Sequence, residues 1–149
     1  MSSAVDIRDD GPVIVAIVVL PGCAPERALA AFTDPALLAE WWRGNLTASL
    51  VPGGDYTVAF PAIGATLAGR IQSYEPGQSL EFSWAWTDDD SPPSTVRVQV
   101  KPGADRPSTV LVVEHGPHAE DAAGQRAHQE HWDGWEYFLP RLAAVLSGS

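Results

Sequence analysis

The sequence has little positive charge for its size. In 149 residues, Lys and Arg total 9 against 19 Asp and Glu, which gives a formal net charge of −10 at pH 7. The cationic residues are scattered along the chain and form no basic cluster. Because nucleic-acid backbones and anionic membranes are bound by clustered Lys and Arg, this composition argues against nucleic acid and membrane surfaces as partners.

Cysteine and long apolar segments are also scarce. The single Cys23 excludes an internal disulfide and is typical of a reducing compartment, so we expect a cytoplasmic location. The apolar run Val13–Leu20 is far shorter than the roughly 20 residues that span a bilayer. Its downstream Gly22-Cys23 is similar to a lipoprotein cleavage site, which is an alternative interpretation. The acidic flank at residues 6–10 favours a strand instead, because a secretory signal begins with positive charge.

The remaining composition is that of a globular protein. Hydrophobic residues make up 45% of the chain, and its length fits one domain, so we expect residues 1–149 to form a single domain with residues 1–11 as a flexible N-terminus. Pro25 near a helix start and Asp34-Pro35 at a second one predict two short helices, at residues 24–32 and 34–42. Short β-rich runs separated by Gly and Pro predict an antiparallel meander. With Val13–Leu20, the predicted strands are Leu46–Val51, Asp55–Pro61, Thr66–Tyr74, Ser79–Trp86, Thr95–Lys101 and Ser108–His115.

After Pro117 the apolar period becomes helical. Residues spaced by three and four positions form one face of a long C-terminal helix: His128, His131, Trp135, Phe138, Leu142 and Leu146. Pro140 interrupts this pattern and predicts a kink, because it removes one backbone hydrogen bond. Apolar residues beyond it predict that the helix continues. The chain is therefore predicted to be an α+β domain with seven strands.

The order of several short motifs resembles a known family. These motifs are Ala24-Pro25-Glu26-Arg27, Thr33-Asp34-Pro35 with Trp41-Trp42, Pro52-Gly53-Gly54-Asp55-Tyr56, Gly69-Arg70-Ile71, Tyr74-Glu75-Pro76, Leu80-Glu81-Phe82-Ser83-Trp84, the strand from Thr109 to His115, and His131 followed by Gly134-Trp135. Together they resemble the heat-shock-protein-90 ATPase activator-homologue family of the START-like (SRPBCC) superfamily. The resemblance implies a helix-grip fold, in which a curved seven-stranded antiparallel sheet surrounds the C-terminal helix and leaves a cavity. It implies no shared catalytic residues and no particular reaction.

Aromatic residues are the strongest candidates for a binding site. The sequence contains six Trp, and Phe82, Trp84 and Trp86 share one face of a predicted strand. These side chains could fill a core, or they could line a cavity for a flat apolar ligand. We predict a site for an apolar or aromatic small molecule that is lined by Trp42, Tyr56, Phe60, Trp84, Trp86, His115, His131, Trp135 and Phe138.

The four histidines fall close together in the sequence, and His128 and His131 are three residues apart on one helix face. This spacing could hold a metal, but no Cys joins it and the His-Glu-x-x-His pattern is missing, so we predict neither a metal nor a cofactor. His115 and His131 are expected to be polar groups of the cavity. Two alternatives to a binding protein remain: a cyclase- or hydrolase-type enzyme that uses one of these histidines, and a co-chaperone-like interaction module with a chaperone or a second copy as its partner.

Overall fold

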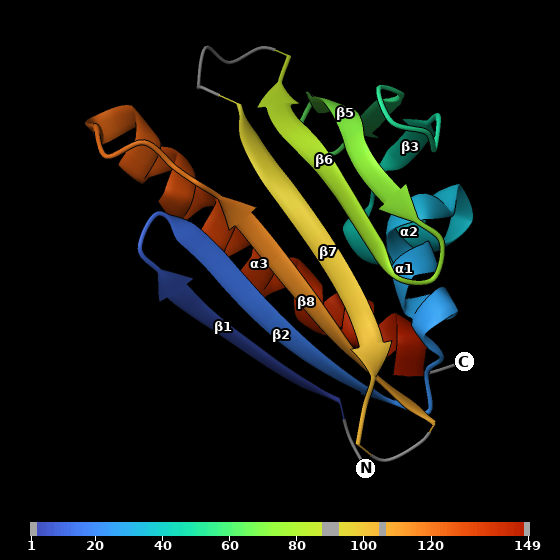
Figure 1. Ribbon diagram of the computed structural model, residues 1–149. Helices are drawn as coiled ribbons and strands as arrows, with labels where there is room; N and C mark the ends of the chain where they lie inside the picture. The colour runs from blue at the N-terminus through green and yellow to red at the C-terminus, as the bar shows by residue number, and fades with distance from the viewer. Residues whose placement is uncertain (1–2, 88–92, 105–106, 148–149) are drawn as a thin grey trace.

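An eight-stranded antiparallel sheet forms the frame of the molecule (Figure 1). The computed structural model describes residues 3–87, 93–104 and 107–147. The strand order in the sheet is β1-β2-β8-β7-β6-β5-β4-β3, and the elements follow one another along the chain. They are β1 (Ala4–Asp10), β2 (Val13–Pro21), α1 (Pro25–Thr33), α2 (Pro35–Trp42), β3 (Asn45–Ala48), β4 (Asp55–Phe60), β5 (Ala65–Glu75), β6 (Ser79–Trp86), β7 (Ser94–Pro102), β8 (Ser108–Gly116) and α3 (Ala122–Ser147).

The first strand corrects the sequence prediction. Residues 4–10 were expected to belong to a flexible N-terminus, and the sheet was expected to have seven strands. Instead, Ala4–Asp10 form β1, which pairs with β2 along its whole length. Its alternating Val5 and Ile7 pack against the core, and Gly11 takes the positive φ of 63° that the tight turn into β2 requires. The acidic residues of this segment obscured a mostly exposed strand in which only Val5 and Ile7 are half-buried.

The two short helices form as their sequences predict. Pro25 stands at the first position of α1, where its missing N–H is not needed. The carboxylate of Asp34 accepts a hydrogen bond from the backbone N–H of Ala36 at 3.0 Å and caps α2. Arg43 ends α2 in the left-handed conformation, with φ of 58°. This turn directs the chain from Trp42 into β3.

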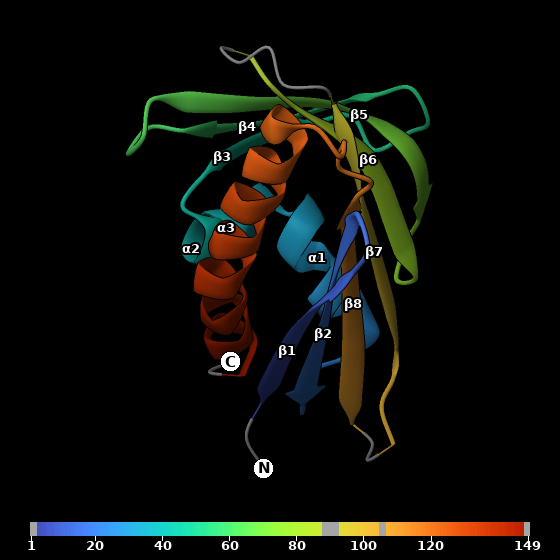
Figure 2. The same cartoon turned by 90° about the vertical axis from the view of Figure 1, so that its left-hand side faces the viewer.

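The sheet curves around α3, which lies along its concave side (Figure 2). A register irregularity between Ile71 and Ser73 interrupts the pairing of β5 with β6, and such irregularities bend a sheet. Strands β3, β4 and β5 cross over one end of α3 in this view, whereas β1, β2 and β8 run beside it. The helix continues through Pro140 to Ser147, as expected, because Leu142 and Leu146 remain buried beyond it.

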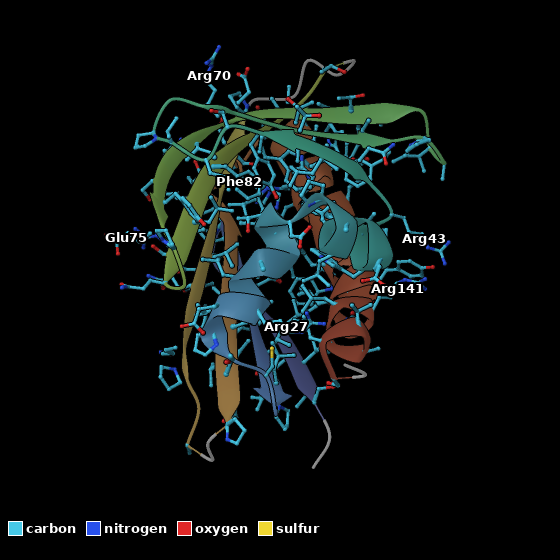
Figure 3. The ribbon with its side chains drawn as sticks, turned by 90° about the vertical axis from the view of Figure 1, so that its right-hand side faces the viewer. Arg27, Arg43, Arg70, Glu75, Phe82 and Arg141 are labelled. Carbon is cyan, nitrogen blue, oxygen red and sulfur yellow. The ribbon has the colours of Figure 1, made fainter. Side chains whose placement is uncertain are left out.

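Aromatic stacking fills the core between the helices and the sheet. Tyr56 and Phe82 stack with ring centroids 4.0 Å apart, and the Tyr56 hydroxyl donates a hydrogen bond to the Phe32 carbonyl at 2.6 Å. Phe82 points into this interior, whereas Arg70 and Glu75 lie on the outside (Figure 3). Among the described residues, no helix has the length and hydropathy that crossing a bilayer would require.

Candidate ligand-binding pocket

A pocket of about 300 Å³ opens between α3 and the part of the sheet formed by β4 and β6. Its volume lies at the lower end of the range of small-molecule sites. The end of α2, the segment after β4, strand β6 and the middle of α3 all contribute to it. The lining residues are Trp42, Arg43, Phe60, Ala62, Ile63, Trp84, Trp86, Glu130, His131, Gly134, Trp135, Tyr137 and Phe138.

Three tryptophans from three different elements form the inner wall of this pocket. The Trp42 ring lies 5.7 Å from that of Trp84 and 5.5 Å from that of Trp135, and the last two rings are 6.1 Å apart. All three side chains are at least 94% buried. The interplanar angles of 34° to 60° tilt the rings relative to one another, so they form broad faces rather than a close-packed stack.

Seven of the nine predicted site residues line this pocket. They are Trp42, Phe60, Trp84, Trp86, His131, Trp135 and Phe138. Tyr56 is instead placed in the core, where it is 0% exposed and its hydroxyl is used by the Phe32 carbonyl. His115 is also 0% exposed and lies behind the wall, stacked against His131 with ring centroids 4.1 Å apart. Neither of these two side chains lines the pocket.

The structure adds lining residues that sequence reasoning missed. Glu130, Gly134 and Tyr137 share a face of α3 with the predicted His131 and Phe138, so helical spacing could have identified them. Arg43 and the turn residues Ala62 and Ile63 carry no such periodic signal, because they follow the ends of α2 and β4.

Hydrogen bonds fix the protonation of His115. The indole N–H of Trp135 donates to Nδ1 of His115 at 3.0 Å, and Ser94 Oγ lies 2.7 Å from Nε2. Because an indole nitrogen can only donate, Nδ1 is the acceptor and Nε2 carries the proton of the neutral ring. His115 therefore donates to Ser94 and cannot act as its base, which argues against a serine hydrolase. Burial, followed by the charges of His131, His118 and His128, holds the pKa of His115 well below its ordinary value of 6.5.

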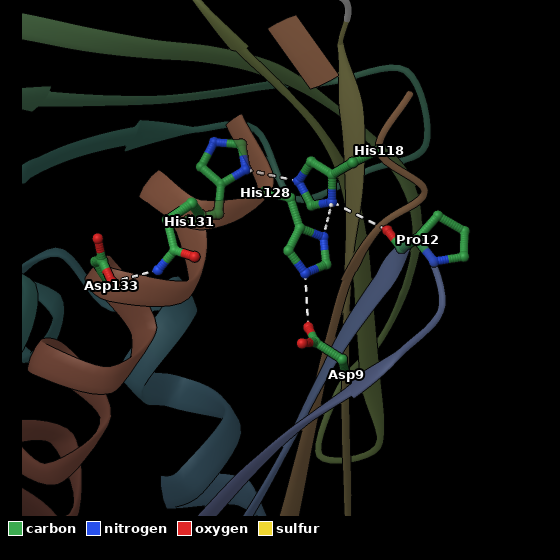
Figure 4. A network of polar contacts seen from close by, with 7 residues as sticks. Asp9, Pro12, His118, His128, His131 and Asp133 are labelled. Carbon is green, nitrogen blue, oxygen red and sulfur yellow. Dashed lines mark hydrogen bonds and ion pairs between the residues drawn. The ribbon is translucent and has the colours of Figure 1, made fainter. Parts of the chain in front are cut away.

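The other three histidines form a chain from the pocket to the surface (Figure 4). Nδ1 of His131 lies 2.8 Å from Nε2 of His118, and Nδ1 of His118 lies 3.0 Å from the Pro12 carbonyl. His128 lies 3.2 Å from His118 through its Nδ1, and its Nε2 lies 2.6 Å from the carboxylate of Asp9. Asp9, Pro12, His118 and His128 all line a second, outer hollow. The chain thus connects the aromatic pocket with the outer hollow.

The arrangement of the histidine rings suits hydrogen bonding better than metal coordination. Ligand atoms of His115, His118 and His131 lie within 4.8 Å of one another. However, both ring nitrogens of His115 are engaged by Trp135 and Ser94, and the ring is stacked nearly parallel to His131 at 20°. A bound metal needs a ring nitrogen with an available lone pair in the plane of each imidazole. Hydrogen bonds account for the cluster without an ion.

Acid should destabilise the fold through the two buried histidines. Burial lowers the pKa of His115 and also that of His118. Below about pH 6.5 the unfolded chain therefore binds protons that the folded chain does not, and stability falls as the pH falls. The slope has an upper limit of about 1.4 kcal/mol per pH unit for each such histidine. Urea unfolding at several pH values between neutrality and mild acid measures how the free energy of unfolding changes with pH. The variant His115→Gln should show a shallower slope, and equal slopes in both proteins would contradict the prediction.

The curved antiparallel sheet, the C-terminal helix in its grip and the pocket between them define a START-like domain of the helix-grip class. Within this class, the chain belongs to the family of activator of Hsp90 ATPase homolog 1-like proteins, whose family model matches residues 23–147. The family predicted from the sequence is confirmed. A search of curated proteins finds no match to this chain.

Solved structures with a similar fold confirm the helix-grip architecture. DynU16, a protein in the dynemicin biosynthetic locus, is 25% identical with a TM-score of 0.76; the match covers 93% of this chain and 48% of DynU16, so this chain spans about half of that protein. CalU16 from Micromonospora echinospora is 22% identical, with a TM-score of 0.69 and coverage of 99% and 84% of the two chains. A protein from Arthrobacter aurescens is 18% identical, with a TM-score of 0.75 and coverage of 97% and 92%. For the last two, the similarity shows the fold alone.

Proposed function

We propose that this protein binds a flat, mostly apolar aromatic small molecule in the pocket between α3 and β6. The observation that carries the proposal is the pocket itself: about 300 Å³ of space whose inner wall is made of three tryptophan rings. A core of this composition would normally be filled, because protein interiors are close-packed. Indole faces offer large contact areas to a planar ring system.

The mouth of the pocket supports the same proposal. Ile63 and Tyr137 line it, although they are 70% and 56% exposed. Large apolar side chains that surround an opening are typical of a surface that a ligand covers. Arg43 and Glu130 also line the pocket. These charged side chains favour a ligand that carries a polar group at one end and an apolar ring system at the other.

Trp84 offers one specific polar contact. Its indole N–H is buried and has no hydrogen-bond partner among the described residues. An unsatisfied buried donor costs about 1–3 kcal/mol. A ligand oxygen that reaches this N–H would accept its hydrogen bond and recover part of that cost. The pocket therefore favours an aromatic ligand with an oxygen substituent over a pure hydrocarbon.

Binding of a neutral aromatic probe tests the proposal. We expect 2-methoxynaphthalene to quench the tryptophan fluorescence and to raise the melting temperature, since a ligand at a hundredfold excess over its Kd adds about 2.7 kcal/mol of stability. The matched control is the saturated, non-planar methoxydecalin, which should give a much smaller response. Absence of any shift in melting temperature across a library of planar aromatic compounds would overturn the proposal.

A further inference from the structure

Arg43 brings a positive charge to the aromatic pocket. It follows α2 directly after Trp42, whose ring lies 5.7 Å from that of Trp84 and 5.5 Å from that of Trp135. Arg43 and Trp42 both line the pocket. Among the residues that the structure describes, no carboxylate forms an ion pair with Arg43 and no polar group is hydrogen-bonded to its side chain. The guanidinium is therefore available to a ligand.

The backbone conformation of Arg43 does not explain why an arginine stands at this position. The residue has a φ of 58°, and within the described part of the chain it is the one non-glycine residue with positive φ. Glycine and asparagine adopt this left-handed region more easily than arginine does. An uncommon conformation at the edge of a pocket points to a function of the side chain there.

A second arginine lies next to the mouth of the pocket. Tyr137 lines this mouth, and the guanidinium carbon of Arg141 lies 5.4 Å from the centroid of the Tyr137 ring. Arg141 is also not paired with a carboxylate in the described part of the chain. Figure 3 shows Arg43 and Arg141 on the same side of the molecule. Their positive charges are therefore not neutralised by an ion pair with a described residue.

Glu130 supplies a negative charge to the pocket lining, and it lies farther along α3. It precedes Tyr137 by about two helical turns, or roughly 10 Å along the helix axis, and it precedes Arg141 by roughly 16 Å. A ligand that extends along α3 therefore meets a carboxylate towards the start of the helix and a guanidinium towards its end. An anionic group on the ligand is favoured at the end near Tyr137.

We infer that the aromatic ligand carries a carboxylate, and that Arg43 selects it over neutral and cationic ligands of the same shape. The inference rests on the proposed function and names its ligand class: a planar aromatic carboxylic acid, bound as its anion. A guanidinium matches a carboxylate with two parallel hydrogen bonds. The N–H of Trp84 also only donates, which fits a ligand whose polar atoms are oxygens. The rings lie against the tryptophans, and the carboxylate stays at the partly exposed mouth, where less of its hydration is lost.

Three probes of matched shape test this inference. They are 6-methoxynaphthalene-2-carboxylate, the corresponding carboxamide and the corresponding aminomethyl compound, which at neutral pH are an anion, a neutral molecule and a cation. By isothermal titration, we expect the carboxylate to bind about fivefold more tightly than the carboxamide, as for a favourable ion pair that is partly exposed. The cation should bind more weakly than both. Because the net charge of −10 opposes this order, it requires a local positive charge at the pocket.

Variants assign the preference to Arg43. In Arg43→Gln, the dissociation constants of the carboxylate and the carboxamide should become nearly equal, because the carboxylate loses affinity and the carboxamide keeps it. Arg43→Lys keeps the charge and should keep part of the preference. Arg70→Gln is the matched control, since it changes the net charge by the same amount. Arg70 lies on the outside of the sheet, 3.5 Å from the carboxylate of Asp55, so this variant should keep the wild-type ratio.

The outcomes distinguish this inference from the proposed function. If none of the three probes binds and no other planar aromatic compound does, the proposed function fails. If the probes bind with equal affinity, or the cation binds most tightly, the pocket is a binding site and the inference of a carboxylate ligand is overturned. A preference for the carboxylate that is unchanged in Arg43→Gln, or that is lost equally in Arg70→Gln, would overturn the role of Arg43.

Discussion

Replacement of Gly134 by leucine is expected to weaken ligand binding strongly without loss of the fold. Gly134 lies in the middle of α3 on the wall of the pocket, and a Cβ built there meets no atom within 4 Å. A leucine side chain would therefore extend into the space that the ligand needs. Both leucine and alanine are better helix formers than glycine by about 0.5–1 kcal/mol, so the variant should melt at the same or a higher temperature.

Gly134→Ala is the matched control for this variant. It makes the same change in backbone freedom and adds a single methyl group, so it should gain stability and keep most of the binding. The dissociation constant of 2-methoxynaphthalene should rise by about tenfold or more in Gly134→Leu compared with Gly134→Ala. Isothermal titration of the two variants measures this ratio. Equal affinities would show that the ligand does not occupy the pocket beside α3.

Replacement of Trp41 by alanine is expected to lower the free energy of unfolding by roughly 3–5 kcal/mol. Trp41 is 0% exposed and stacks on Trp42 with ring centroids 4.9 Å apart. Its indole N–H also donates a hydrogen bond to the Ala31 carbonyl at 2.8 Å. The substitution removes this bond and leaves a large void in the interior. Urea unfolding measures the loss, provided that the slope with denaturant stays constant.

Trp86→Ala is the comparison that separates the core from the pocket. Trp86 packs only partly against the core and lines the pocket, so part of its ring already faces open space. Its removal should cost clearly less than that of Trp41. Because domains of this size have about 5–15 kcal/mol of total stability, Trp41→Phe serves as a milder variant if Trp41→Ala does not fold. Equal losses at Trp41 and Trp86 would show that the pocket wall is packed as tightly as the core.

Local patterns made most of the fold predictable. The strand Ser79–Trp86 was predicted with the bounds that the structure shows, because its apolar residues alternate and turn residues stand at both ends. Asp34-Pro35 likewise predicted the start of α2. β1 was missed, because three aspartates mask the alternation of Val5 and Ile7.

The site was predictable in its aromatic part and not in its polar part. Trp84 and Trp135 lie on regular faces of β6 and α3, so periodicity could identify both of them as candidates for the site. The contact between Asp9 and His128 joins residues 119 positions apart, and no spacing rule encodes it. Tyr56 was expected in the pocket, but the Phe32 carbonyl holds its hydroxyl inside the core. Which polar atoms pair depends on how the sheet curves, and the sequence pattern does not carry that information.

The outer edge of the sheet has a consequence for association between molecules. β1 pairs with β2 on one side and has no described strand on the other, so its backbone could recruit a strand from a second molecule. Its charged residues, Asp6, Arg8, Asp9 and Asp10, oppose such edge-to-edge pairing, and the net charge of −10 adds long-range repulsion. Asp9 also holds His128. If this edge evolved into a dimer interface, the carboxylate of Asp9 would have to stay in place to hold His128. Resistance to aggregation and the order of the histidine chain therefore depend on the same residue.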